Sequence, residues 1–151
     1  MTTTKDLYQA CLAIAMKAHE GQTRHDGKTP YIKHPLELAS MFDSHVEKCV
    51  AILHDAVEDG KVNGVDWDYL QMELFPFKAS LGGDFVQYVL DGVLHLTHWP
   101  EDSYDTYIKS MGSKYIKFKI MDITINLSDS PKEHQKEKYK KAMKLLVDKL
   151  K

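Results

Sequence analysis

Residues 51–60 read AILHDAVEDG and place a polar pair, His54 and Asp55, in the middle of an apolar run. Apolar residues recur around this pair at the spacing of a helix, which predicts one continuous helix over residues 46–59. On such a helix Glu58 and Asp59 lie one turn beyond the pair, on the same face. The stretch therefore predicts a helix that carries ionisable side chains into apolar surroundings.

The rest of the chain also reads at helical period, and no segment alternates long enough to form a sheet. We therefore expect an all-α fold, a compact bundle of about seven to nine helices. The other expected helices cover residues 4–20, 35–42, 66–74, 84–95, 104–110, 113–127 and 131–150. In the first of them, one apolar stripe consists of Leu7, Cys11, Ile14, Ala15 and Ala18.

Several helix ends are also predicted. His19 ends the first helix near its negative pole, where an imidazolium is favourable. The segment FPFKASLGG, residues 75–83, contains a proline and two glycines and should separate two helices. The last helix has the clearest start, with Ser130 as N-cap, Pro131 as first residue and Glu133 as capping-box acid.

Length and composition narrow the class of protein. A chain of 151 residues fits a single domain, residues 1–151. Its formal net charge of -2 argues against a general nucleic-acid binder, which would need a basic face, although it leaves small anionic ligands open. The apolar runs are too short to span a membrane, and the N-terminus lacks the pattern of a signal peptide. We therefore expect a cytoplasmic protein with no membrane or nucleic-acid partner.

The acidic residues around His54 require a positive partner. Unpaired carboxylates are costly in a partly buried helix. A divalent metal ion is the economical partner, and imidazole with carboxylate ligands suits manganese, iron or zinc. The alternative is a helix with a few surface charges near its end.

Two other positions strengthen the interpretation as a metal site. His34 stands at a junction between a loop and a helix in TPYIKHPLELA, where it is well placed to direct a ligand. Asp122 is surrounded by apolar residues in KFKIMDITINL and needs a partner, with Asn126 on the same helical face. That partner is either Lys119, one turn earlier, or a metal ion.

Four motifs in a fixed order then resemble a known family. They are HEGQTRHDGKTPYIKHP (19–35), ILHDAVED (52–59), LTHWPEDSYDTYI (96–108) and KIMDITIN (119–126). Together they resemble the HD-domain alarmone hydrolases, which comprise the single-domain small alarmone hydrolases and the hydrolase domain of the Rel/Spo proteins. The resemblance implies an HD-domain helical bundle and a hydrolase that acts on a small nucleotide.

The resemblance also implies roles for individual residues. It predicts a metal ion, usually Mn²⁺, with Fe, Zn or Co also compatible with the ligands. The implied metal ligands are His34, His54, Asp55 and Asp122. The acids that handle the water are Glu58 and Asp59. The implied substrate contacts are Arg24, His25, Lys119 and Asn126, whereas Tyr31 supports the loop.

The implied reaction removes the 3′-pyrophosphate from guanosine tetra- or pentaphosphate. The same site chemistry suits other substrates, namely an adenosine analogue of the alarmone, the 2′-phosphate of NADPH or a deoxynucleotide. A nucleotide-binding protein without turnover is the alternative from another class. Some positions depart from the family pattern: His25 stands where lysine is common, Gly60 where threonine is common, and Ile123 where a basic residue is common.

Overall fold

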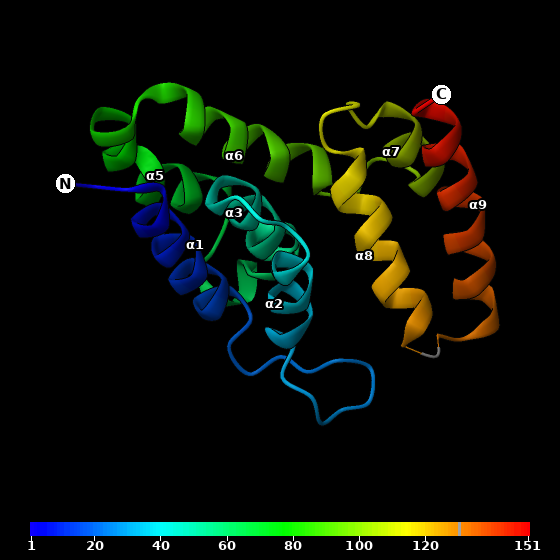
Figure 1. Ribbon diagram of the computed structural model, residues 1–151. Helices are drawn as coiled ribbons and strands as arrows, with labels where there is room; N and C mark the ends of the chain where they lie inside the picture. The colour runs from blue at the N-terminus through cyan, green and yellow to red at the C-terminus, as the bar shows by residue number, and fades with distance from the viewer. Residues whose placement is uncertain (130) are drawn as a thin grey trace. The chain divides into compact units, whose positions relative to one another are not determined.

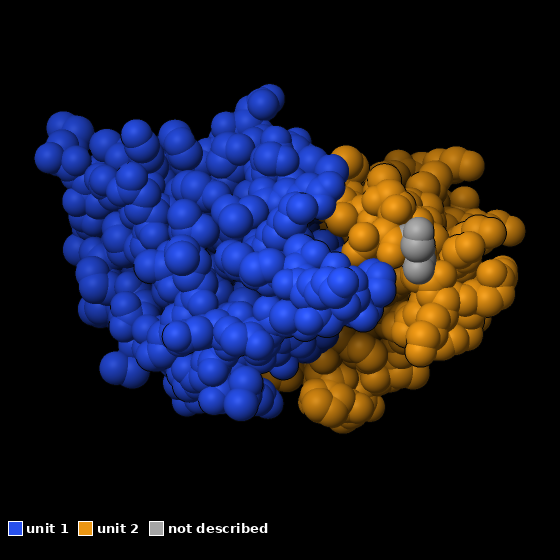
Figure 2. Space-filling view, turned by 90° about the horizontal axis from the view of Figure 1, so that it is seen from below, with its two compact units in different colours: residues 1–97 blue, residues 98–151 orange. Residues whose placement is uncertain are grey.

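The computed structural model describes residues 1–129 and 131–151, which form two compact units, residues 1–97 and residues 98–151 (Figure 2). Both units are helical (Figure 1). The described residues contain nine α-helices and one short 3-10 helix, and their only bridge between extended residues joins Thr23 to Pro30. The predicted all-α fold and its number of helices are confirmed. Within the described part of the chain, every helix is too short or too polar to span a membrane.

The first unit is arranged around α3. Its elements are α1 (Thr4–Ala18), α2 (Lys33–Ser40), α3 (His45–Leu53), α4 (Ala56–Asp59), η1 (Lys61–Asn63), α5 (Trp67–Leu81) and α6 (Gly83–Leu96). Helix α3 packs against α1, α2 and α6 (Figure 1). Five consecutive residues, 49–53, are fully buried, because neighbours cover the helix on every side. His54 therefore directly follows a fully buried segment of the core.

Helix α1 confirms the apolar stripe expected from the sequence. Its five predicted residues are the buried ones, and each is at most 4% exposed. The helix starts at a capping box in which Thr3 and Asp6 exchange hydrogen bonds. It ends at Ala18 rather than residue 20, with His19 as the C-cap and Gly21 at a φ of 76°.

The prediction of one continuous helix over residues 46–59 is wrong. Helix α3 ends at Leu53, α4 starts at Ala56, and the two intervening residues form a turn. A side-chain contact accompanies this break: His54 Nδ1 lies 2.7 Å from the Ala51 carbonyl oxygen and so competes for an acceptor of the helix backbone. The chain turns helical again with a bond of 2.9 Å from the Asp59 N–H to the Asp55 carbonyl.

The predicted break over residues 75–83 is also wrong in its extent. Helix α5 continues through Pro76 to Leu81, and only Gly82 separates it from α6. A proline removes one N–H donor and crowds the carbonyl four residues earlier. That carbonyl belongs to Met72, a residue that is 75% exposed, so water can satisfy it.

The second unit contains α7 (Tyr104–Ser110), α8 (Ile116–Ser128) and α9 (Glu133–Lys149), and α9 packs against both others (Figure 1). The predicted start of α9 is partly wrong. Its N-cap is Lys132, whose extended backbone excludes Pro131 from the helix, while Ser130 lies outside the described residues. The division into two units leaves the single domain over residues 1–151 a prediction.

Candidate metal centre

A hairpin-like loop between α1 and α2 positions His34 and Tyr31 at the site. Backbone hydrogen bonds from Arg24 to Thr29 and from Tyr31 to Gln22, each 2.8 Å long, close this loop. Gly27 adopts a φ of 70° at its tip, where a residue with a side chain would be strained. The loop leads directly into α2, so the second residue of that helix, His34, is held in its first turn.

Three predicted ligands converge in the first unit. His34, His54 and Asp55 each offer one ligand atom, and these atoms lie within 4.8 Å of one another. The two histidines are 3% and 2% exposed, and their ring centroids are 5.2 Å apart. Two imidazoles and a carboxylate are suitable ligands for a divalent transition metal. This cluster could therefore hold a metal ion.

The orientation of His54 provides a test of that fit. Its Nδ1 must carry the proton of the bond to the Ala51 carbonyl, because a carbonyl only accepts. In a neutral imidazole Nε2 is then an acceptor, yet it lies 2.9 Å from Asp55 Oδ2, which is another. Two acceptors this close need either a proton or a metal cation between them. The donor set therefore fits a cation.

Asp55 has a further contact on the same oxygen. The Tyr31 hydroxyl donates a hydrogen bond of 2.6 Å to Asp55 Oδ2, and His34 Nε2 lies 3.9 Å from that atom. Tyr31 thus links the loop to the cluster, which agrees with the supporting role expected from the sequence. The carboxylate is half-buried and faces protein groups on several sides.

The two acids of α4 lie in different environments. Glu58 is exposed, whereas Asp59 is half-buried. Burial and the negative charges of Asp55 and Glu58 raise the pKa of Asp59 to about 7, although His54 acts in the opposite direction. A carboxyl group with such a pKa can exchange a proton near neutral pH. A cation bound at Asp55 would lower this pKa, because it would offset the nearby negative charge.

His19 and Gln22 connect the loop to this short helix. Gln22 Oε1 lies 3.0 Å from His19 Nδ1, and Gln22 Nε2 donates to the Asp59 carbonyl at 2.8 Å. The sequence did not predict this bridge. The spacing of His19 and Gln22, three residues apart at the end of a helix, was the only signal for their contact.

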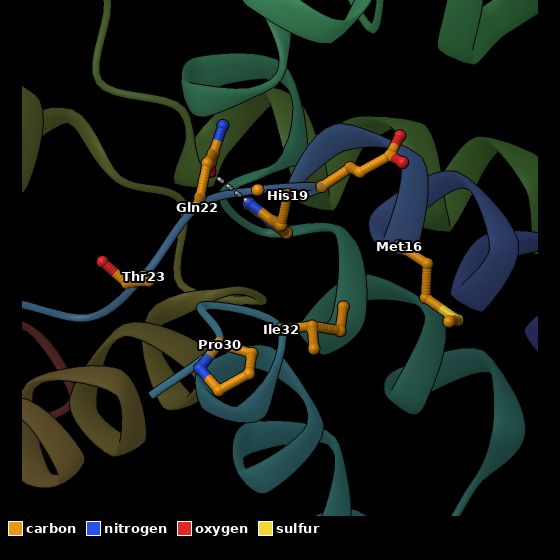
Figure 3. Close-up of a pocket in the computed structure, with 8 residues that line it drawn as sticks. Met16, His19, Gln22, Thr23, Pro30 and Ile32 are labelled. Atoms are coloured by element: carbon orange, nitrogen blue, oxygen red, sulfur yellow. Dashed lines mark hydrogen bonds between the residues drawn. The ribbon is translucent and has the colours of Figure 1, made fainter. Parts of the chain in front are cut away.

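The expectation of an imidazolium at His19 is wrong. The side chain is 3% exposed, and this burial lowers its pKa despite the bond to Gln22. His19 and Gln22 line a pocket of about 310 Å³. Figure 3 shows these two side chains with Pro30 and Ile32, which also line it. Tyr31, between these two loop residues in the chain, turns instead towards Asp55.

Arg24 and His25 occupy the loop itself. The Arg24 guanidinium lies 5.5 Å from the centre of the Tyr31 ring, and the residue is half-buried. His25 is exposed near the tip of the loop. Contacts of either residue with a substrate stay predictions.

The remaining predicted site residues form a cluster within the second unit. Asp122 is 3% exposed, and its carboxylate accepts hydrogen bonds from Lys119 Nζ at 2.9 Å and from Asn126 Nδ2 at 3.4 Å. Burial disfavours the charge of Lys119, but Asp122 raises its pKa well above the usual value overall, so Lys119 keeps its proton. The contact between Lys119 and Asp122, one of the two possibilities open from the sequence, is therefore present. A role of Asp122 as a fourth metal ligand stays a prediction.

Comparison with known proteins finds relatives for part of the chain. It is 43% identical over 70 residues to the bifunctional (p)ppGpp synthase/hydrolase SpoT of Escherichia coli K12. The same figures hold for guanosine-3′,5′-bis(diphosphate) 3′-pyrophosphohydrolases of Escherichia coli O157:H7 and Shigella flexneri. The match covers 44% of this chain and 10% of each relative, so the chain spans only a small part of their length. No family model matches the chain.

Proposed function

We propose that the chain is a divalent-metal-dependent hydrolase of guanosine tetra- and pentaphosphate. It would release the 3′-pyrophosphate and leave GDP or GTP. The observation that carries this proposal is the convergence of ligand atoms from His34, His54 and Asp55 within 4.8 Å, beside the acid pair of α4. The partial similarity to 3′-pyrophosphohydrolases supports the choice of substrate.

His34, His54 and Asp55 would hold the ion, and we propose Asp122 of the second unit as the fourth ligand. We also propose that residues 1–151 form a single HD-type domain. We propose Mn²⁺ as the ion, and Fe, Zn or Co would also suit the ligand set. When bound, the ion would supply Lewis-acid polarisation of a phosphoryl oxygen and would make a nearby water more acidic.

The acid pair of α4 would handle the protons. Asp59 has a pKa of about 7 without metal, and the charge of a bound ion would lower it, so that its carboxylate could accept a proton at neutral pH. The water oxygen would then form a bond to the phosphorus that is attached to the 3′-oxygen of the ribose. The bond from that phosphorus to the 3′-oxygen would break, and the 3′-oxygen would leave with the electron pair and take up a proton. Glu58, which is exposed, is suited to exchanging protons with solvent.

Basic residues would bind the charged substrate. Arg24 carries a fixed positive charge and planar donors that suit a phosphate group. Lys119 is held beside Asp122 at 2.9 Å, so we propose that it contributes positive charge near a phosphate while it orients this carboxylate. Asn126 would contact the ribose or base, and His25 would make a weaker phosphate contact than the lysine common in the family.

Product analysis of one panel tests this proposal. Purified protein loaded with Mn²⁺ is incubated separately with guanosine tetraphosphate, its adenosine analogue, NADPH and a deoxynucleoside triphosphate. Chromatography then separates the products. We expect pyrophosphate and GDP from the guanosine compound alone, and no reaction with Asp55→Ala. Orthophosphate release, or turnover of another compound only, would contradict the proposed reaction. Tight binding of guanosine tetraphosphate without turnover would instead support a nucleotide-binding protein.

A further inference from the structure

Tyr31 contacts more parts of the candidate site than any role in supporting the loop requires. Its hydroxyl donates to Asp55 Oδ2 at 2.6 Å. Its ring lies 4.7 Å from the His19 ring and 5.8 Å from the His34 ring, between centroids. The Arg24 guanidinium lies 5.5 Å from the ring centre. One side chain thus touches a proposed metal ligand and a proposed substrate contact.

We propose that Tyr31 is a positioning residue with two separable parts. Its hydroxyl orients the Asp55 carboxylate towards the metal ion. Its ring holds the Arg24 guanidinium in position to bind the phosphate groups of the substrate. This inference rests on the proposed function, because it assigns roles towards the metal and the nucleotide of that same site.

The hydroxyl of Tyr31 restricts a side chain that is otherwise free to rotate. The terminal torsion of an aspartate is broad, so packing alone fixes the plane of its oxygens poorly. A hydrogen bond of 2.6 Å to one oxygen removes much of that freedom. A carboxylate oxygen has more than one acceptor site, so Oδ2 can accept from Tyr31 and still face His54 Nε2, 2.9 Å away. Partners that orient a metal ligand in this way contribute to metal affinity.

Backbone and side-chain contacts fix the position of Tyr31. Its N–H donates to the Gln22 carbonyl at 2.8 Å, and its ring packs against His19, whose own Nδ1 is bonded to Gln22. Because Gln22 also donates to the Asp59 carbonyl, the loop, the end of α1 and the acid-bearing α4 are tied together. A hydroxyl placed by such a network can fix the group to which it donates.

The ring of Tyr31 acts on Arg24. A guanidinium near an aromatic ring is attracted to it and loses part of its rotational freedom. A side chain already restricted in this way loses less entropy when it binds a phosphate. The ring of Tyr31, rather than its hydroxyl, provides this surface, so replacing tyrosine by phenylalanine should leave it intact.

Two variants of Tyr31 separate the two parts. Tyr31→Phe removes only the hydroxyl, and Tyr31→Leu removes the aromatic ring as well. The control is Tyr69→Phe, a half-buried tyrosine of α5 whose ring lies 4.3 Å from the Lys17 ammonium. Thermal unfolding of the metal-free proteins checks that each variant folds.

The first readout is metal binding, which requires no substrate. Metal-free proteins are titrated with Mn²⁺ by calorimetry, and the visible spectrum of each Co²⁺-loaded protein is recorded. We expect Tyr31→Phe to weaken Mn²⁺ binding by about 10-fold to 100-fold and to change the Co²⁺ spectrum, while Tyr69→Phe does neither. Wild-type affinity and spectrum in Tyr31→Phe would overturn the role of the hydroxyl.

The second readout is steady-state kinetics with guanosine tetraphosphate at saturating Mn²⁺. We expect Tyr31→Phe to keep the wild-type KM. Tyr31→Leu should raise KM about 5-fold or more, because the Arg24 guanidinium loses its contact with the aromatic ring. Equal KM values in the two variants would overturn the role of the ring. A wild-type protein that binds neither Mn²⁺ nor Co²⁺ would overturn the proposed function itself. Normal wild-type binding with an unaffected Tyr31→Phe would overturn the hydroxyl inference alone.

Discussion

His54 Nδ1 lies 2.7 Å from the carbonyl oxygen of Ala51, one turn earlier in the chain. This contact takes an acceptor of the α3 backbone and accompanies the end of that helix at Leu53. It also fixes which nitrogen of His54 carries the proton, and so leaves Nε2 to face Asp55 Oδ2 at 2.9 Å. One hydrogen bond thus shapes both the turn and the candidate ligand set.

The first prediction concerns the carboxylate of this set. Asp55→Ala removes the anionic member of the cluster, so we expect Mn²⁺ affinity to fall by more than about 100-fold. Calorimetric titration of the metal-free protein measures the change. Asp68→Ala, which removes an exposed acid of α5, is the matched control and should bind Mn²⁺ as the wild type does. Undiminished binding in Asp55→Ala would show that the ion lies elsewhere.

The second prediction separates metal binding from proton transfer. The double variant Glu58→Gln with Asp59→Asn keeps both side-chain shapes but removes the groups that accept a proton. We expect it to bind Mn²⁺ and to lose turnover by about 100-fold to 10,000-fold. Pyrophosphate release and calorimetry are measured on the same preparation. Turnover at the wild-type rate would mean that the pair has another role.

The third prediction follows from the raised pKa of Asp59. In the folded protein without metal this pKa is about 7, compared with an ordinary value of 3.8. Above about pH 4 the unfolded chain therefore releases this proton more readily than the folded chain, so this group lowers stability as pH rises to about 7. Asp59→Asn removes the effect. We expect the variant to gain more stability at pH 8 than at pH 5.

Urea unfolding in the presence of a chelator measures that difference. The chelator is essential, because a bound cation would lower the pKa of Asp59 and reduce the effect. Asp68→Asn, which replaces an exposed acid of α5, serves as the control and should show little dependence on pH. A gain in Asp59→Asn that is equal at both pH values would contradict the raised pKa.

The fourth prediction explains the glycine at position 60. A Cβ atom there would clash with the Ala56 carbonyl oxygen and would lie 2.8 Å from Ala18 Cβ. Gly60→Ala should therefore destabilise the protein by about 1–3 kcal/mol. Gly83→Ala is the control, because a Cβ at that position meets no atom within 4 Å. Thermal or urea unfolding compares the two, and similar stability in both variants would refute the close packing.

Helical periodicity predicted much of the fold because burial repeats with the helix. The five apolar residues of the α1 stripe are buried as expected. The break at His54 could not be predicted in this way, because it accompanies a side chain that competes for a backbone carbonyl. The sequence also predicted a helix break at Pro76, yet α5 continues through it. The helix can continue because Met72 is exposed, and exposure depends on the tertiary structure.

The sequence motifs predicted the residues of the candidate metal centre. His34 lies 20 residues before the adjacent pair His54 and Asp55, yet the motifs named all three residues and the fold brings their ligand atoms together. The bridge from His19 through Gln22 to the Asp59 carbonyl had no comparable signal, because a contact to a backbone atom leaves no trace in the partner's residue type. The raised pKa of Asp59 depends equally on burial that appears only in the folded chain.

Metal content and turnover, measured on the same samples, test the central claim most directly. The protein is stripped with a chelator, analysed for metal and assayed for pyrophosphate release from guanosine tetraphosphate as Mn²⁺ is added back in steps. We predict no release without metal and a rise that saturates at one ion per chain. Pyrophosphate release at an undiminished rate from the stripped protein would contradict a metal centre at His34, His54 and Asp55.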